Sequence, residues 1–208
     1  MDVGIIGLPQ AGKTTVFNAV THGHAATGYG AGTEPNVGVV KVPDRRLWSL
    51  SELFHPKKTT PADLTFVDFP AGGAAFGPGG SGPGSRFLTD LGRMDGLVEV
   101  VRAFQSPEVP HPAGSVDPDR DIGSMDLELA FADLALIEKR LERLETQVRS
   151  AKPQEREQGE RELALLRRLK AGLEEERPIR AQELTEDERR AIETYKFLTQ
   201  KPLLVLLN

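Results

Sequence analysis

The chain has 208 residues, a formal net charge of −5 and no cysteine. This length allows one large domain or two small ones. The negative charge gives no global basic surface that would bind nucleic acid or a membrane. The absence of cysteine excludes disulfides, zinc–cysteine sites and thiol nucleophiles. Because no apolar run approaches the roughly 18 residues that span a bilayer, and a core strand is predicted too near the start for a signal peptide, we expect a soluble cytoplasmic protein without DNA or membrane partners.

A glycine-rich loop at residues 7–14 fits the pattern G-x-x-x-x-G-K-[ST]. A short apolar strand is predicted before it at residues 3–6 and an amphipathic helix after it at residues 14–20, and this order is typical of a loop that wraps nucleoside triphosphate phosphates. Lys13 is predicted to contact the β- and γ-phosphates, and the Thr14 hydroxyl to bind Mg²⁺. The alternative is a plain glycine-rich turn. The candidate nucleotide-binding residues here are Gly7, Pro9, Gln10, Ala11, Gly12, Lys13, Thr14 and Thr15.

A second buried strand, predicted at residues 64–68, ends in a carboxylate at Asp68. P-loop enzymes hold their magnesium ion with an aspartate in this position, so Asp68 is a candidate metal residue. The glycine-rich stretch at residues 72–84 favours a flexible switch over a disordered linker, and residues 22–32 form either a nucleotide-sensing loop or a plain surface loop. Further elements are predicted as strands at residues 37–42 and 96–101 and helices at residues 46–54 and 86–94.

From residue 126 onward, apolar residues recur at steps of three and four among charged residues. This spacing predicts a long amphipathic helix up to a break at residues 150–153, then a second helix to about residue 176, folded back as an antiparallel hairpin with a coiled-coil-like seam. A capping box at residues 185–188 predicts a third helix. The apolar strand at residues 203–207 is typical of the middle of a parallel sheet, so we expect the chain to be part of a longer polypeptide.

Four segments outside the phosphate loop, at residues 34–44, 56–62, 114–122 and 138–145, together resemble the YchF family of Obg-like ATPases, within the translation-factor class of P-loop NTPases. The resemblance runs over nearly all of the chain. It implies a nucleotide domain interrupted by a helical arm and followed by a base-recognition motif and a TGS domain. It also implies hydrolysis of ATP, with varying acceptance of GTP, and association with ribosomes. Asn208 would be the first residue of the base-recognition motif.

Together, the elements and the resemblance predict an α/β fold: a P-loop NTPase G domain with a mostly parallel sheet flanked by helices, interrupted by an antiparallel helical hairpin. We place the nucleotide-binding domain at residues 1–123, the arm at residues 124–198 and a returning core strand at residues 199–208.

The chain departs from the family's usual pattern in its first switch and its phosphate loop. Gln10 and Ala11 stand where the family usually has Asn-Val, the asparagine of which helps to hold a potassium ion in related enzymes. The switch threonine is replaced by Gly32, so that Thr33 is the nearest substitute as a metal residue.

The turn after Asp68 also differs, because it is one residue longer than the family's Asp-x-x-Gly. Gly72 is expected to offer its N–H to the γ-phosphate. Gly73 stands where a glutamine would orient the attacking water, and we therefore expect slow intrinsic turnover.

The function expected from these features is Mg²⁺-dependent hydrolysis of ATP or GTP by a ribosome-associated protein, with Lys13, Thr14 and Gly72 as catalytic residues and Thr14, Asp68 and Thr33 as metal residues. One alternative is a nucleotide-binding switch with little or no catalysis. Another is an adaptor whose arm docks on the large ribosomal subunit or its RNA through its arginines. Those arginines alternate with glutamates, a pattern more typical of a solvated helix face.

Overall fold

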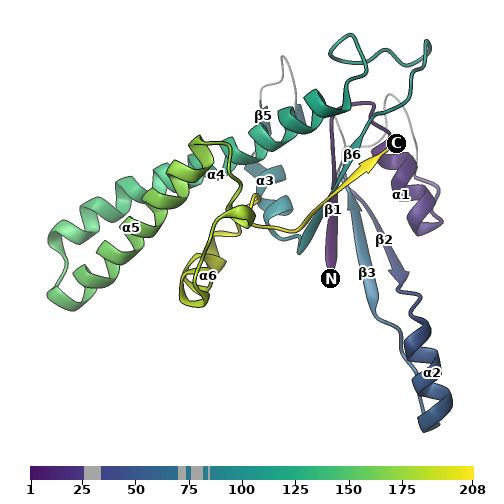
Figure 1. Cartoon of the computed structure of the whole chain (residues 1–208), viewed down its shortest axis with the longest axis horizontal. Coiled ribbons are helices and arrows are strands. Elements are labelled where there is room, and N and C mark those ends of the chain that lie inside the picture. The colour runs from purple at the N-terminus through teal and green to yellow at the C-terminus, as the bar shows by residue number, and fades with distance from the viewer. Residues whose placement is uncertain (26–33, 70–73, 76–81, 84) are drawn as a thin grey trace.

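The computed structural model describes residues 1–25, 34–69, 74–75, 82–83 and 85–208. Its centre is a five-stranded sheet with the strand order β2-β3-β1-β6-β7 (Figure 1). The strands β1 (Asp2–Ile6), β3 (Asp63–Asp68), β6 (Gly96–Val101) and β7 (Leu203–Leu207) are parallel, and β2 (Asn36–Lys41) is antiparallel to β3. The predicted α/β fold with a mostly parallel sheet is therefore confirmed.

Helices cover both faces of this sheet because its strands alternate apolar side chains between the two faces. On one face, Ile5 and Val100 pack with Phe17 of α1 (Lys13–Thr21). On the other face, Ile6 and Leu97 pack with residues of α3 (Ser85–Gly92) and α4 (Pro118–Ser150). The sheet thus holds the loop between β1 and α1 at the carboxyl ends of the strands.

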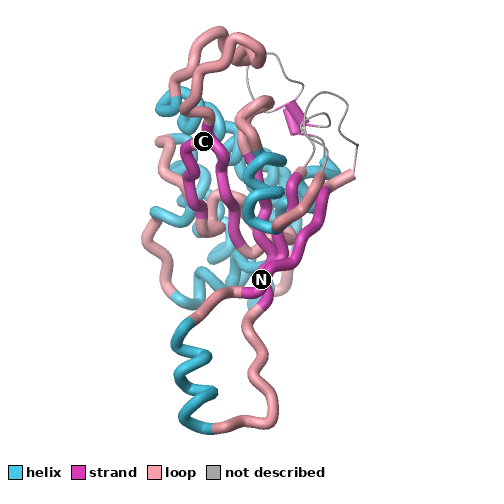
Figure 2. Tube along the Cα trace, turned by 90° about the vertical axis from the view of Figure 1, so that its right-hand side faces the viewer, coloured by secondary structure: helices cyan, strands magenta, loops and turns pink. Residues whose placement is uncertain are grey.

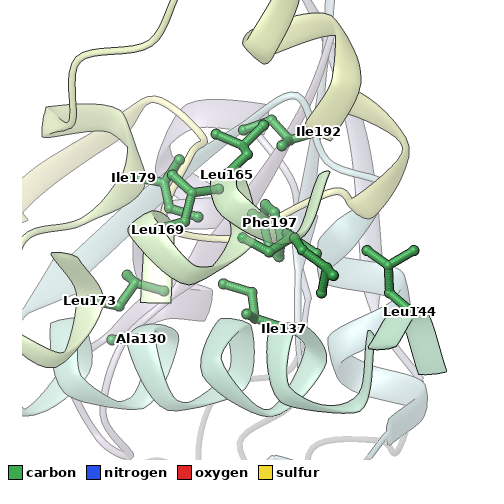
Figure 3. Packing of buried hydrophobic residues seen from close by; sticks show 11 residues of the cluster. Ala130, Ile137, Leu144, Leu165, Leu169, Leu173, Ile179, Ile192 and Phe197 are labelled. Atoms are coloured by element: carbon green, nitrogen blue, oxygen red, sulfur yellow. The ribbon is translucent and has the colours of Figure 1, made fainter. Parts of the chain in front are cut away.

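The helical arm consists of α4 and α5 (Pro153–Glu174), which form the antiparallel hairpin expected from the sequence (Figure 1). Its core is an apolar cluster of its own, in which leucines of α5 pack on α4 and on the segment that leads back to the sheet (Figure 3). That segment contains η1 (Ile179–Ala181), α6 (Glu186–Ile192) and η2 (Glu193–Tyr195), and the predicted capping box at Thr185 opens α6.

Helix α4 begins at Pro118, eight residues before the start predicted from its periodicity. Asp117 caps it by accepting a hydrogen bond from the Arg120 N–H, and Pro118 suits the first helical position. The first turns of α4, up to Leu129, face the sheet rather than α5, since Met125 and Leu129 belong to the sheet cluster. One continuous helix thus crosses the boundary that we expected between residues 123 and 124.

Strand β7 lies at the edge of the described sheet, although its apolar sequence is typical of a strand with neighbours on both sides. It pairs only with β6 among the described strands, and Leu204 and Leu207 are exposed. Two further short strands, β4 (Ala74–Ala75) and β5 (Gly82–Pro83), pair with each other where the sequence predicts a flexible glycine-rich segment.

Helix α2 (Arg45–Phe54) projects from the end of the sheet at which β2 ends and β3 begins (Figures 1 and 2). Asp44 caps it by accepting a hydrogen bond from the Arg46 N–H. Among the described helices, none combines the length and hydropathy that crossing a lipid bilayer requires.

Candidate nucleotide-binding site

The loop between β1 and α1 has a backbone that only glycine tolerates at two positions. Gly7 has φ 141° and Gly12 has φ 94°, and residues other than glycine rarely adopt such values. A Cβ on Gly7 would lie 2.3 Å from the carbonyl oxygen of Val100, and one on Gly12 would lie 2.2 Å from Nδ2 of Asn208. The loop is therefore pressed against β6 and β7, and α1 starts directly after it at Lys13.

The Lys13 ammonium is buried inside this loop. It donates hydrogen bonds of 2.9 and 3.0 Å to the carbonyl oxygens of Gly7 and Leu8. Burial lowers the pKa of Lys13 from its ordinary value to about 8, although the nearby Asp68 carboxylate opposes this shift. The structure thus places a desolvated cation at the loop that is predicted to hold a polyphosphate.

Asp68 meets the start of α1, as predicted for a metal residue. The register of the sheet pairs Ile5 with Asp68, which brings the end of β3 beside the end of β1. The Thr14 hydroxyl donates a hydrogen bond of 2.7 Å to Oδ2 of Asp68. Oδ1 of this carboxylate, which is 1 % exposed, has no hydrogen-bond partner among the described residues.

This pair of oxygen ligands fits a magnesium ion. Mg²⁺ prefers one or two carboxylates together with waters and substrate phosphates, so a carboxylate and a hydroxyl are enough protein ligands. A buried carboxylate oxygen without a hydrogen bond is costly unless something else compensates it, and a cation would do so. The part of the chain that the structure describes holds no group of three or more acidic or histidine ligands that could bind a metal without help from a substrate.

Asn208 lies against the same loop, 197 positions away in the sequence. Its side chain donates a hydrogen bond of 2.9 Å to the carbonyl oxygen of Ala11. Its backbone continues the pairing of β7 with β6, since its N–H bonds to the Val101 carbonyl at 2.8 Å. Asn208 therefore supports the loop from the side of β7.

The remaining predicted site residues are distributed differently. Pro9 and Gln10 are half-buried in the loop, and Thr15 is exposed on the first turn of α1. Gly72 and Thr33 lie outside the described residues, so their predicted roles at the γ-phosphate and the metal stay predictions.

Asn36 belongs to the site although the sequence assigned it no role. Its side-chain amide donates a hydrogen bond of 3.1 Å to Oδ2 of Asp68, from the first residue of β2. The antiparallel register places the two residues opposite each other. The only signal in the sequence is that Asn36 lies within one of the four family-like segments.

A buried polar cluster behind the loop was also missed. Glu99 and Arg102 line a narrow crevice with Pro9 of the loop, together with His111 and Asp121, which are 2.9 Å apart. Burial, assisted by the nearby Asp126 carboxylate, raises the pKa of Glu99 to about 8. The sequence signal is a charged residue within the apolar strand at residues 96–101.

The sequence and the fold of this chain were compared with those of known proteins. No protein-family model matches the chain. It is 40% identical over 210 residues to a Bacillus subtilis protein named "Ribosome-binding ATPase YchF", and 40% identical over 207 residues to the Haemophilus ducreyi protein of the same name, with 100% and 99% of this chain covered. The solved structure of the Schizosaccharomyces pombe YchF GTPase covers 100% of this chain with a TM-score of 0.78 and 34% identity.

The chain belongs to the YchF family. The resemblance inferred from four segments is thereby confirmed, and the fold agrees with that of the Schizosaccharomyces pombe YchF protein from end to end of this chain. The chain spans 56% of the length of each of these YchF relatives.

Proposed function

We propose that this chain binds ATP or GTP together with Mg²⁺ at the loop of residues 7–14 and hydrolyses it, as the nucleotide domain of a ribosome-associated regulatory NTPase. The observation that supports this most directly is the contact of 2.7 Å between Thr14 and Asp68 beside the buried Lys13 ammonium. The names of the YchF relatives support the ribosome association and, with it, a cytoplasmic location.

Phosphoryl transfer asks the protein mainly to position the phosphates and neutralise their charge. In our proposal the loop N–H groups bind the phosphates, and the Lys13 ammonium turns from the carbonyls of Gly7 and Leu8 to the β- and γ-oxygens. Thr14 and Asp68 hold the magnesium ion, and Thr33 is a further candidate. A magnesium ion held there by Thr14 and Asp68 would supply positive charge that offsets the negative charge of the phosphates. The N–H of Gly72, which lies outside the described residues, is the candidate donor to the γ-phosphate.

Turnover is proposed to be slow because Gly73 stands where other enzymes of this class have a glutamine that orients the attacking water. The same observation supports a second candidate function, a nucleotide-binding switch with little catalysis. Phosphate release under multiple turnover, measured beside nucleotide affinity, separates the two. Competition between ATP and GTP identifies the preferred base.

Lys13→Ala and Asp68→Asn test the proposed site. Without Lys13 the phosphate charge loses its main protein cation, so we expect at least a hundredfold loss of affinity for fluorescent ATP and GTP analogues and no measurable turnover. Asp68→Asn removes the anionic metal ligand, so we expect binding in EDTA to change little while the gain from added Mg²⁺ disappears. The control is Lys139→Ala, which removes an exposed lysine of the arm.

Unchanged affinity and turnover in Lys13→Ala would refute the assignment of the loop. Circular dichroism of each variant shows whether the fold is retained. Co-sedimentation with ribosomes tests the proposed partner separately from nucleotide binding.

A further inference from the structure

The segment that connects β2 to β3, residues 41–63, is here named the α2 protrusion. The register pairs Lys41 with Asp63 at one end of these strands and Asn36 with Asp68 at the other. The protrusion therefore leaves the sheet at the end opposite the nucleotide loop, and it points away from the arm as well (Figures 1 and 2). A partner bound to it would leave the nucleotide site open.

Apart from the half-buried Leu47, the large apolar side chains of helix α2 are exposed. Helix α2 has no buried residue. Trp48, Leu53 and Phe54 are 52 %, 70 % and 71 % exposed. Phe54 and Lys58 line a shallow groove between α2 and the segment that returns to β3. Large apolar side chains that gather on a projecting element mark an interaction surface more often than chance exposure does.

The protrusion is basic in an acidic chain. It contains five basic and three acidic residues, whereas the whole chain has a net charge of −5. Asp44 pairs with Arg46 and Asp63 with Lys41. Across the described residues, no ion pair engages the remaining cations, which are Arg45, Lys57 and Lys58.

The arm is less suited to binding a polyanion, although it has more arginines than the α2 protrusion. Four of the arginines that suggested RNA contact form salt bridges with glutamates: Arg140 with Glu162, Arg161 with Glu157, Arg167 with Glu145 and Arg168 with Glu188. Residues 118–198 contain 20 acidic and 16 basic residues, so the arm as a whole repels a polyanion.

Each exposed aromatic ring of the protrusion has a cation beside it. Arg45 precedes Trp48 by three positions on α2, and residues at this spacing are neighbours on a helix surface. Lys58 lines the same groove as Phe54. Cations that bind phosphates beside rings that stack on bases are the chemistry by which proteins bind single-stranded RNA.

We propose that the α2 protrusion is an RNA-docking surface, in which Arg45, Lys57 and Lys58 bind phosphates while Trp48 and Phe54 stack on unpaired bases. A second copy of the chain fits less well, because two basic protrusions would repel each other. A membrane surface fits less well too, because Leu47, Leu50 and Phe54 line the groove on one side of α2, whereas Trp48 lies on another side. The inference that RNA docks here follows from these observations alone. That this RNA is ribosomal rests on the proposed function.

The charge of the surface is tested with the 208-residue chain, free of nucleotide, and a fluorescently labelled 20-nucleotide single-stranded RNA. The triple variant Arg45→Glu/Lys57→Glu/Lys58→Glu should bind at least about tenfold more weakly. The slope of log affinity against log salt concentration should become less negative by about 2, because each lost phosphate contact changes this slope by about 0.7. The matched control is Lys139→Glu/Arg143→Glu/Arg149→Glu, which makes the same charge change at exposed arm positions and should keep the affinity within about twofold.

The stacking part is tested through Trp48, the only tryptophan of the chain. Its fluorescence should be quenched when the RNA is added. Trp48→Ala should lose about fivefold or more in affinity without a change in salt dependence, and Trp48→Phe should restore most of it. Since Trp48 is exposed, neither substitution removes a core contact.

Three results would overturn the proposal: no binding of the RNA, an equal loss of affinity in the two triple variants, or tryptophan fluorescence that does not respond to bound RNA. Binding of phosphatidylserine vesicles, lost in the α2 triple variant while RNA is not bound, would instead assign the surface to membranes. Lys13→Ala should leave RNA binding unchanged. RNA binding and nucleotide binding can therefore be tested independently of each other.

Discussion

Two charged residues, Lys13 and Asp68, are taken out of water by the fold at the candidate site. Burying a charge costs free energy unless partners compensate it. The two loop carbonyls compensate Lys13 in part, while Oδ1 of Asp68 has no hydrogen-bond partner among the described residues. Burial of these two groups therefore lowers the stability of the fold. A polyphosphate and a divalent cation bound at the site would compensate their charges.

The lowered pKa of Lys13 predicts a pH dependence of nucleotide binding. Its folded pKa of about 8 lies below the ordinary value of 10.5, so between these pH values the folded protein loses this proton before the unfolded chain does. Below pH 8 the ammonium is charged and its burial destabilises the fold. As pH rises from 8 to 10.5 this penalty is relieved, so the contribution of Lys13 to stability increases.

Nucleotide binding should respond in the opposite sense, because a phosphate beside Lys13 favours the charged amine. We expect the affinity for ATP to fall by about tenfold or more between pH 7.5 and 9.5, and binding above pH 8 to take up a proton. Titration calorimetry in buffers of different ionisation enthalpy measures this uptake. Equal affinity at both pH values, with no buffer dependence, would contradict the buried-ammonium geometry.

Among the elements, α4 runs from the sheet into the arm, and its Asp133 holds the segment by which the chain returns to the sheet. Its buried carboxylate accepts hydrogen bonds from the N–H groups of Leu198 and Thr199, each 2.8 Å long, and one of 2.7 Å from the Thr199 hydroxyl. Burial raises the pKa of Asp133 to about 6, although these hydrogen bonds oppose the shift. The chain therefore leaves the sheet along α4 and returns to it at a fixed place before β7.

The geometry of the loop and of α4 predicts opposite effects for the same substitution, Gly→Ala. Gly7→Ala forces a side chain into φ 141° and against the Val100 carbonyl, so we expect it to lower the free energy of unfolding by at least about 2 kcal/mol. Gly123→Ala lies within α4, where a Cβ meets nothing within 4 Å, and should raise it by about 0.5–1 kcal/mol. Urea denaturation followed by circular dichroism measures both, and equal effects would contradict the strained loop.

As a whole, the molecule has separate apolar cores in the arm and around the sheet. The arm core also includes Phe197 and Ile179, from the segment that returns to the sheet, so the hairpin is not an isolated pair of helices. The α2 protrusion belongs to neither core. The chain therefore presents two projections of different character, one with its own apolar core and a net negative charge, and one with exposed aromatic rings and three cations that form no ion pair among the described residues.

Because the cores are separate, a cavity in one core should destabilise mainly the elements that surround that core. Leu166→Ala removes a side chain with no exposed surface from the arm core and should cost about 2–5 kcal/mol. Hydrogen exchange should speed up in α4 and α5 more than in β1 and β3. Leu127→Ala, at a position that is 42 % exposed, should cost no more than about 0.5 kcal/mol. Equal acceleration in the sheet would show that the two cores unfold together.

The sequence by itself determined the elements whose pattern is local. The glycine loop, the capping box at Thr185 and the spacing of leucines in the hairpin each follow from short-range geometry, and Asp68 could be inferred from its place after an apolar strand. The tertiary structure decided the start of α4, the antiparallel pairing of β2 with β3 and the contact of Asn36 with Asp68. These depend on strand order and register, which arise from packing between residues distant in sequence and leave no periodic signal in any one segment.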